Sequence, residues 1–100
     1  MGQKKHTSIP RSVKDAVWKR DGHRCILCGR PEAGPWCHFI ARSQGGLGIE
    51  ENVWTGCQRC HSLFDQGSGP AAVQARKAVW AYLTALYPGW NEADLIYEKG

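Results

Sequence analysis

The stretch Cys25-Ile26-Leu27-Cys28 and its counterpart Cys57-Gln58-Arg59-Cys60, which His61 follows directly, decide the fold of this chain. A CxxC pair forms a tight knuckle that presents two thiolates, and two such pairs supply the four ligands of a tetrahedral zinc ion. We therefore predict one structural Zn²⁺ held by Cys25, Cys28, Cys57 and Cys60. A chain of 100 residues buries only about two thirds of its unfolded surface. Binding of structural zinc contributes about 10–16 kcal/mol, so the ion would stabilise a core this small.

The cysteine count and the distribution of apolar residues indicate the compartment in which the protein works. The fifth cysteine, Cys37, makes the cysteine count odd, which argues against a closed disulfide framework and for metal binding in a reducing compartment. The polar start Met1-Gly-Gln-Lys-Lys-His6 does not resemble a signal peptide. No run approaches the roughly 20 apolar residues that a membrane span requires. We therefore expect a single-domain cytoplasmic protein with no membrane segment.

The charge is asymmetric along the chain. The formal net charge is +4, and the excess lies before Glu32, where only Asp15 and Asp21 oppose the basic residues Lys4, Lys5, Arg11, Lys14, Lys19, Arg20, Arg24 and Arg30. Such a segment suits a polyanion, which makes DNA the expected partner. A solvated basic face with no ligand is an equally good interpretation of the charge alone.

Local patterns predict an α+β domain over residues 1–100, with a basic arm at 1–11, a zinc-stabilised core at 12–67 and a helical extension at 68–100. We expect a first helix capped by Ser12 and ending near Arg20, with Val13, Val17 and Trp18 buried. Strands are predicted at 36–42 and 53–55, and a helix at 61–65. A long helix at 71–87 should bury Val73, Val79, Trp80, Leu83, Leu86 and Tyr87, and Asn91 should cap a final turn. The five tryptophans are expected mainly in the core, with an exposed one that stacks on a nucleic-acid base as the alternative.

The middle of the chain carries a joint pattern. It runs Cys25-x2-Cys28, then His38-Phe-Ile-Ala-Arg-Ser-Gln-Gly-Gly46, then Glu51-Asn52-x4-Cys57-x2-Cys60-His61. This pattern resembles the HNH endonuclease family, in particular its small zinc-knuckled members from bacteria and phages. The resemblance implies a treble-clef-like ββα-metal finger, in which a hairpin is crossed by a helix with a catalytic divalent cation between them. It also implies hydrolysis of DNA to a 5′ phosphate and a 3′ hydroxyl.

The resemblance assigns a role to each of three residues. His38 matches the general base, and imidazole suits that task because its unperturbed pKa is about 6.5. His61 matches the histidine that binds the catalytic cation, and Asn52 matches the amide that holds the hairpin in register. Arg42, just past the base, is expected to contact a DNA phosphate. The alternatives are a zinc-ligating His61, a buried core His38 and an Asn52 that serves only a turn.

One position departs from the family. Where the family places Asp or His immediately before the base, as a cation ligand, this chain has Cys37. A thiolate suits softer ions than Mg²⁺, so Cys37 is either an unusual ligand or a buried filler. Asp65 lies four residues after His61 and would share its helix face. We predict His61 and Asp65 as the ligands of the catalytic cation (Mg²⁺, Mn²⁺ or a softer ion), with a solvent-facing Asp65 as the alternative.

The sequence thus predicts a metal-dependent DNA endonuclease of weak sequence specificity, recruited by a larger phage or bacterial protein complex. The alternative from another class is a non-catalytic zinc module that binds nucleic acid or a protein, which Cys37 favours.

Overall fold

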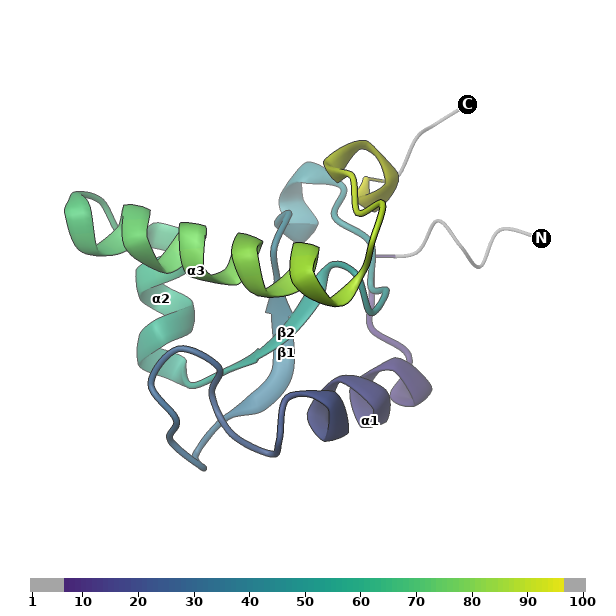
Figure 1. Cartoon of the computed structure of the whole chain (residues 1–100), viewed down its shortest axis with the longest axis horizontal. Helices are drawn as coiled ribbons and strands as arrows, with labels where there is room; N and C mark the ends of the chain where they lie inside the picture. The colour runs from purple at the N-terminus through teal and green to yellow at the C-terminus, as the bar shows by residue number, and fades with distance from the viewer. Residues whose placement is uncertain (1–6, 97–100) are drawn as a thin grey trace.

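A two-stranded antiparallel sheet lies at the centre of the computed structural model, which describes residues 7–96. The elements follow in the order α1 (Arg11–Arg20), β1 (Gly34–His38), η2 (Arg42–Gln44), β2 (Val53–Gly56), α2 (Gln58–Gln66), α3 (Pro70–Leu86) and η3 (Glu92–Leu95). Figure 1 shows the hairpin between α1 and α3, with α2 packed near one end of α3. The predicted α+β class is confirmed, and the secondary structure matches a hairpin followed by a helix.

The two strands pair Cys37 with Trp54 and His38 with Val53, with an irregular register between Gly34 and Cys37. Every residue of β2 is buried. Cys37 and Trp54 belong to a core cluster with Phe64 from α2 and with two residues of α3, Val79 and Leu83. Because neighbouring residues of a strand point to opposite faces, Trp36 and His38 lie on the other face of β1 from Cys37.

The first strand is shorter than predicted. It ends at His38, and the predicted strand end, Arg42, instead begins the 3₁₀ turn η2. The chain bends after Phe39 because the Asn52 side chain, rather than a strand partner, takes the backbone N–H and carbonyl of Ile40. Gly45, at φ 84°, then closes the turn, a left-handed conformation that favours glycine.

The first helix ends at Arg20 as predicted, but it begins at Arg11 rather than after Ser12. Pro10 occupies the N-cap position, and its carbonyl accepts hydrogen bonds from Val13 and Lys14. The predicted capping box is therefore wrong. Because Pro10 is the N-cap residue, the helix begins without a side-chain capping hydrogen bond. Of the predicted arm, residues 1–6, including Lys4 and Lys5, lie outside the described residues.

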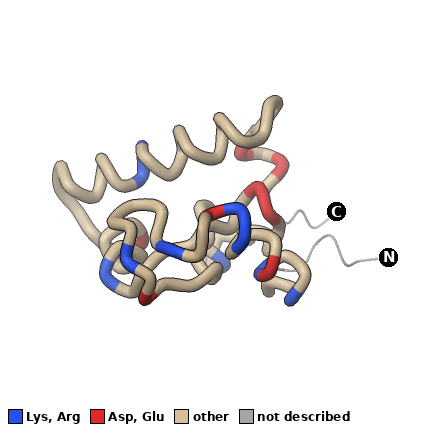
Figure 2. The backbone as a smooth tube through the Cα atoms, turned by 60° about the horizontal axis from the view of Figure 1, so that its bottom comes forward, with Lys and Arg blue, Asp and Glu red and all other residues tan. Residues whose placement is uncertain are grey.

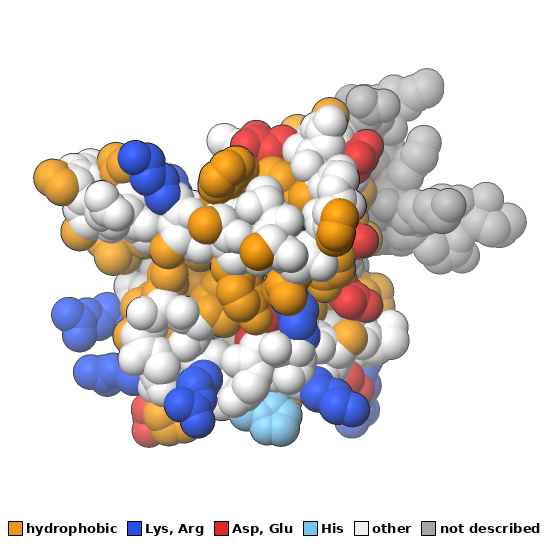
Figure 3. All heavy atoms as spheres, in the orientation of Figure 1, with side chains coloured by type: hydrophobic (Ala, Val, Ile, Leu, Met, Phe, Trp, Pro, Cys, Tyr) orange, Lys and Arg blue, Asp and Glu red, His pale blue; other side chains and the backbone are white. Residues whose placement is uncertain are grey.

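The buried face of α3 confirms the prediction at Val79 and Leu83 and differs from it elsewhere. It consists of Ala72, Ala75, Val79 and Leu83, whereas Val73, Trp80 and Leu86 are 46%, 49% and 40% exposed. The buried positions are three or four residues apart and therefore form one helical stripe. Two of them are alanines, so hydrophobicity alone misplaced the stripe. Figure 3 shows hydrophobic side chains at the surface over α3.

A buried charge network attaches α1 to the rest of the domain. Asp21 accepts hydrogen bonds from the Thr55 backbone N–H, from the Arg20 guanidinium and from the Tyr82 hydroxyl at 2.6 Å. Arg20 also donates to the carbonyls of Glu50 and Val53. Burial and the hydrogen bond to Asp21 raise the pKa of Tyr82 to about 12. These bonds satisfy the two charges that the fold removes from water.

The C-terminal segment is attached through the indole of Trp90 and through the backbone of Leu95, whose carbonyl accepts from the Leu47 N–H at 2.8 Å. Trp90 donates from Nε1 to the Glu51 carbonyl at 2.8 Å, and the side chain of Asn91 caps η3 by accepting from the Ala93 N–H, as predicted. In the part of the chain that the structure describes, no helix has the length and apolarity to cross a membrane.

Candidate metal centre and catalytic cavity

The four cysteines of the two CxxC pairs come together in the structure. The Sγ atoms of Cys25, Cys28, Cys57 and Cys60 all lie within 4.8 Å of one another, and those of Cys28 and Cys57 are 3.6 Å apart. A tetrahedral site with Zn–S bonds of about 2.3 Å has sulfur–sulfur edges of about 3.8 Å. The cluster therefore has the donor set and the size of a structural zinc site. His61 is not needed to complete it.

Each knuckle is built by its own backbone. The Cys28 N–H points to Cys25 Sγ at 3.5 Å, and the Cys60 N–H points to Cys57 Sγ at 3.4 Å. Burial alone would raise the pKa of Cys25, but backbone N–H groups of Cys28, Cys57 and Leu27 lower it to about 7. Such a pKa favours the Cys25 thiolate, the form that binds zinc, whereas burial and the neighbouring cysteines raise the pKa of Cys60, and the pKa of Cys28 is raised as well.

His38 ends β1 and is only 8% exposed. Its Nε2 lies 2.9 Å from the carbonyl oxygen of Thr7, on the segment before α1. Burial lowers the pKa of His38, and the nearby Arg42 and His61 lower it further, against the opposing effect of the Thr7 carbonyl. The imidazole is therefore neutral at pH 7.

Asn52 is fully buried and bonded on every side. Its Oδ1 accepts from the Ile40 N–H at 2.8 Å, while its Nδ2 donates to the carbonyls of Ile40 at 3.2 Å and Leu47 at 2.8 Å. Its own carbonyl accepts from the Phe39 N–H at 2.7 Å. The side chain of Asn52 thus joins the backbone of Ile40 to that of Leu47 within the loop between the strands.

The two histidines of the pattern line one cavity. This cavity has a volume of about 250 Å³, and its lining includes His38, Arg42, His61 and Asp65, together with Trp36, Ala41 and Ser43. His61 and Asp65 come from α2, where the rings of His61 and the buried Trp54 lie nearly perpendicular, with their centroids 6.5 Å apart. Four of the predicted site residues therefore line one cavity: His38, Arg42, His61 and Asp65. Two of these, His61 and Asp65, are the cation ligands predicted on α2.

Cys37 does not share that surface. It is fully buried in the core cluster with Trp54, and it is absent from the residues that line the cavity. Burial raises the pKa of the Cys37 thiol well above its ordinary value. Of the two interpretations of this cysteine, the packing is that of a buried filler.

Two residues around the cavity were missed by the sequence pattern. The Thr7 carbonyl contacts His38 through the backbone, so no side-chain type could have signalled it. The tryptophans were expected mainly in the core, but Trp36 is 46% exposed and borders the cavity. Its place two residues before His38 on the same strand face was the available signal.

The basic residues are unevenly distributed over the elements of the structure. Figure 2 shows basic positions on α1, on the loop that follows it and on α2, while α3 carries only Arg76 and Lys77.

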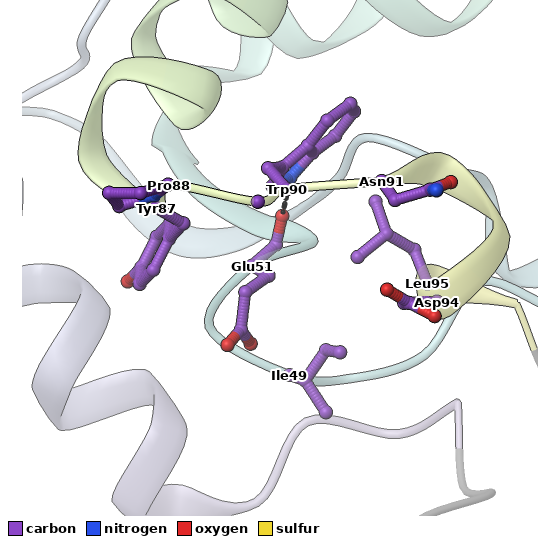
Figure 4. Close-up of a pocket in the computed structure, with 9 residues that line it drawn as sticks. Ile49, Glu51, Tyr87, Pro88, Trp90, Asn91, Asp94 and Leu95 are labelled. Atoms are coloured by element: carbon purple, nitrogen blue, oxygen red, sulfur yellow. Dashed lines mark hydrogen bonds between the residues drawn. The ribbon is translucent and has the colours of Figure 1, made fainter.

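A separate cavity of about 300 Å³ lies between η3 and the loop before β2, and it includes the carboxylates of Glu51 and Asp94 (Figure 4). That cavity contains none of the predicted site residues.

No protein-family model matches this sequence, and neither the curated proteins nor the solved structures contain a significant match to it.

Proposed function

We propose that the protein is a zinc-stabilised, metal-dependent DNA endonuclease of the HNH type. The observation that carries this proposal is the shared cavity, which is lined by His38 of the hairpin and His61 of α2 together with Arg42 and Asp65. The tetrathiolate cluster lies at the N-terminus of the same helix and would fix its position relative to the hairpin.

In this proposal His38 is the general base. A carbonyl oxygen only accepts hydrogen bonds, so the contact with Thr7 places the ring proton on Nε2. Nδ1 then keeps its lone pair and is the atom that accepts a proton from water. The lowered pKa of His38 keeps the ring neutral, and hence competent as a base, at physiological pH.

His61 and Asp65 would hold the catalytic cation. They lie four residues apart on α2 and line the same cavity, and imidazole with carboxylate suits a borderline or hard divalent ion. When bound, such an ion stabilises negative charge on the phosphate and the leaving oxygen. Arg42 is exposed at the rim and would orient the phosphate through its guanidinium.

The test is cleavage of supercoiled plasmid by the zinc-loaded protein with Mg²⁺, Mn²⁺, Ni²⁺ or Zn²⁺, and with EDTA as the blank. We expect His38→Ala to abolish cutting while zinc content and circular dichroism stay unchanged. The control is Gln74→Ala, because Gln74 is exposed on α3 and lines neither this cavity nor any other described above. Nicks that DNA ligase seals without prior treatment would carry the expected 5′ phosphate and 3′ hydroxyl. Unchanged cutting by His38→Ala would refute the assignment of the base.

The second candidate is a non-catalytic zinc module that binds nucleic acid or a protein. The burial of Cys37 favours it, because the residue before the base then contributes no cation ligand. This candidate predicts salt-dependent DNA binding without cleavage under any of the four ions, and binding that His38→Ala leaves intact. Recruitment by a larger phage or bacterial complex is compatible with either candidate.

A further inference from the structure

A second concave surface adjoins the proposed cleavage cavity. It has a volume of about 460 Å³ and is lined by one side of α1 and the start of β1, including Arg11, Lys14, Trp18, Pro35 and Trp36. Trp36 lines both this surface and the cavity that contains His38 and His61. The two concavities are therefore neighbours across a single indole ring, on the face of β1 opposite the core.

The indole of Trp36 is both exposed and held in place. The side chain is 46% exposed, yet its six-membered ring covers Gly34, where a Cβ atom would come within 1.9 Å of it. Trp18, on the other wall, stacks against His23 with ring centroids 5.0 Å apart and an interplanar angle of 27°. Two indoles are thus presented at a hollow whose size falls within the roughly 300–1,000 Å³ of ordinary ligand pockets.

The charges at this hollow favour an anionic occupant. Arg11 and Lys14 line it against a single acid, Asp15. The Arg11–Asp15 pair is 4.0 Å long and highly exposed, and such surface pairs contribute little, so a phosphate can replace the carboxylate. Aromatic rings beside cations are the chemistry that binds unpaired nucleotides, because bases stack on the rings while phosphates meet the cations.

We propose that this hollow binds an unpaired base of the nucleic-acid strand whose phosphate enters the cleavage cavity, with the base stacked on Trp36 and a neighbouring phosphate at Arg11 and Lys14. The inference rests on the proposed nuclease function, since it takes its strand from that cavity. It assigns the protein a preference for single-stranded or locally unpaired DNA over a continuous duplex.

The test compares two tryptophans of nearly equal exposure. Binding of a fluorescent single-stranded 12-mer and of its duplex is measured by anisotropy, with zinc-loaded protein and no added divalent cation. We expect Trp36→Ala to weaken single-strand binding about 5- to 150-fold, the range for loss of one stacked base, and to change duplex binding less than about twofold. Trp36→Phe should restore most of the affinity because it keeps a ring. The control is Trp80→Ala on α3, 49% exposed and remote from the hollow, which should bind like the parent.

Circular dichroism and zinc content establish that each variant is folded. Quenching of the parent's tryptophan fluorescence by oligo(dT) measures base stacking without any substitution. Equal single-strand affinity of the parent, Trp36→Ala and Trp80→Ala would overturn the base pocket, whether or not plasmid is cut. If Trp36→Ala loses single-strand binding but the parent protein cuts no plasmid with any of the ions, the base pocket is supported and the nuclease function is refuted.

Discussion

The side chain of Asn52 offers the sharpest test of the hairpin geometry. Replacement by alanine removes three hydrogen bonds at once, to the Ile40 N–H, the Ile40 carbonyl and the Leu47 carbonyl. The site is fully buried, so water does not readily replace the lost partners. With a net contribution of about 0.5–1.5 kcal/mol for each hydrogen bond, the expected loss of unfolding free energy is about 1.5–4.5 kcal/mol. That is a large share of a total stability of about 5–15 kcal/mol.

The assay is urea denaturation followed by circular dichroism, with free zinc held constant because bound metal shifts the apparent stability. The control is Asn91→Ala, since Asn91 is exposed and its side chain makes a single capping bond, to the Ala93 N–H. We expect a loss of about 1 kcal/mol or less there. Asn52→Asp, which keeps the shape but turns the donor toward Ile40 and Leu47 into an acceptor, should cost at least as much as Asn52→Ala.

A loss below about 0.5 kcal/mol, less than one ordinary hydrogen bond, for both Asn52 variants would refute this account. It would mean that the loop between the strands is held by other contacts. Asn52 would then be a turn residue, as the alternative interpretation of the sequence has it.

Three further perturbations address the metal, the charge network and the position of the base. Removal of zinc by a strong chelator should abolish the cooperative thermal transition, because the site supplies about 10–16 kcal/mol; one equivalent of Zn²⁺, but not Mg²⁺, should restore it. Tyr82 has a higher pKa in the folded protein, about 12, than its ordinary value of 10.0. Its neutral hydroxyl therefore stabilises the fold fully below pH 10 and progressively less as the pH rises toward 12, so the stability difference between the parent and Tyr82→Phe in urea titrations should shrink across that window. Gly48→Ala places a Cβ atom within 2.1 Å of the Ser8 carbonyl oxygen; it should displace the segment that holds His38 and slow plasmid cleavage with zinc content unchanged.

Each of these has a clear contrary result. An apoprotein that melts cooperatively at the same temperature would remove zinc from the folding free energy. A parent–Tyr82→Phe difference that is constant from pH 10 to pH 12 would contradict the burial of the Tyr82 hydroxyl against Asp21. Parent-like cleavage by Gly48→Ala would show that the contact between Thr7 and His38 has no part in positioning the base.

The sequence predicted the cysteine cluster and the second strand because both depend on local spacing. The two-residue spacing within each CxxC pair determines a knuckle that presents two sulfurs, whatever the rest of the fold. The structure brings all four sulfurs together. The end of the first strand could not be predicted in this way. It depends on Asn52, twelve residues later, capturing the backbone of Ile40, and such a tertiary contact overrides the strand preference of Phe39 and Ile40.

The same limit explains the errors on α3. Val73 and Trp80 are more hydrophobic than Ala72 and Ala75, but the alanines face the core. A hydrophobic pattern records which residues prefer burial, whereas the side of the helix that is buried depends on which neighbours approach it. The four cysteines were better predicted than the core because paired CxxC spacing identifies metal ligands without reference to hydropathy.

The burial of Cys37 follows from the placement of His38. Adjacent residues on a strand point to opposite faces, and Trp36 and His38 face the cavity, so the side chain between them enters the core beside Trp54. An acid at this position would be a buried charge without a partner rather than a second cation ligand, which is a costly arrangement. In the proposed nuclease the cation therefore depends on α2 alone for its protein ligands, through one imidazole and one carboxylate. Mixed nitrogen and oxygen donors bind Mn²⁺, Ni²⁺ or Zn²⁺ better than Mg²⁺, so the departure at Cys37 shifts the expected cation toward these softer ions without removing the general base.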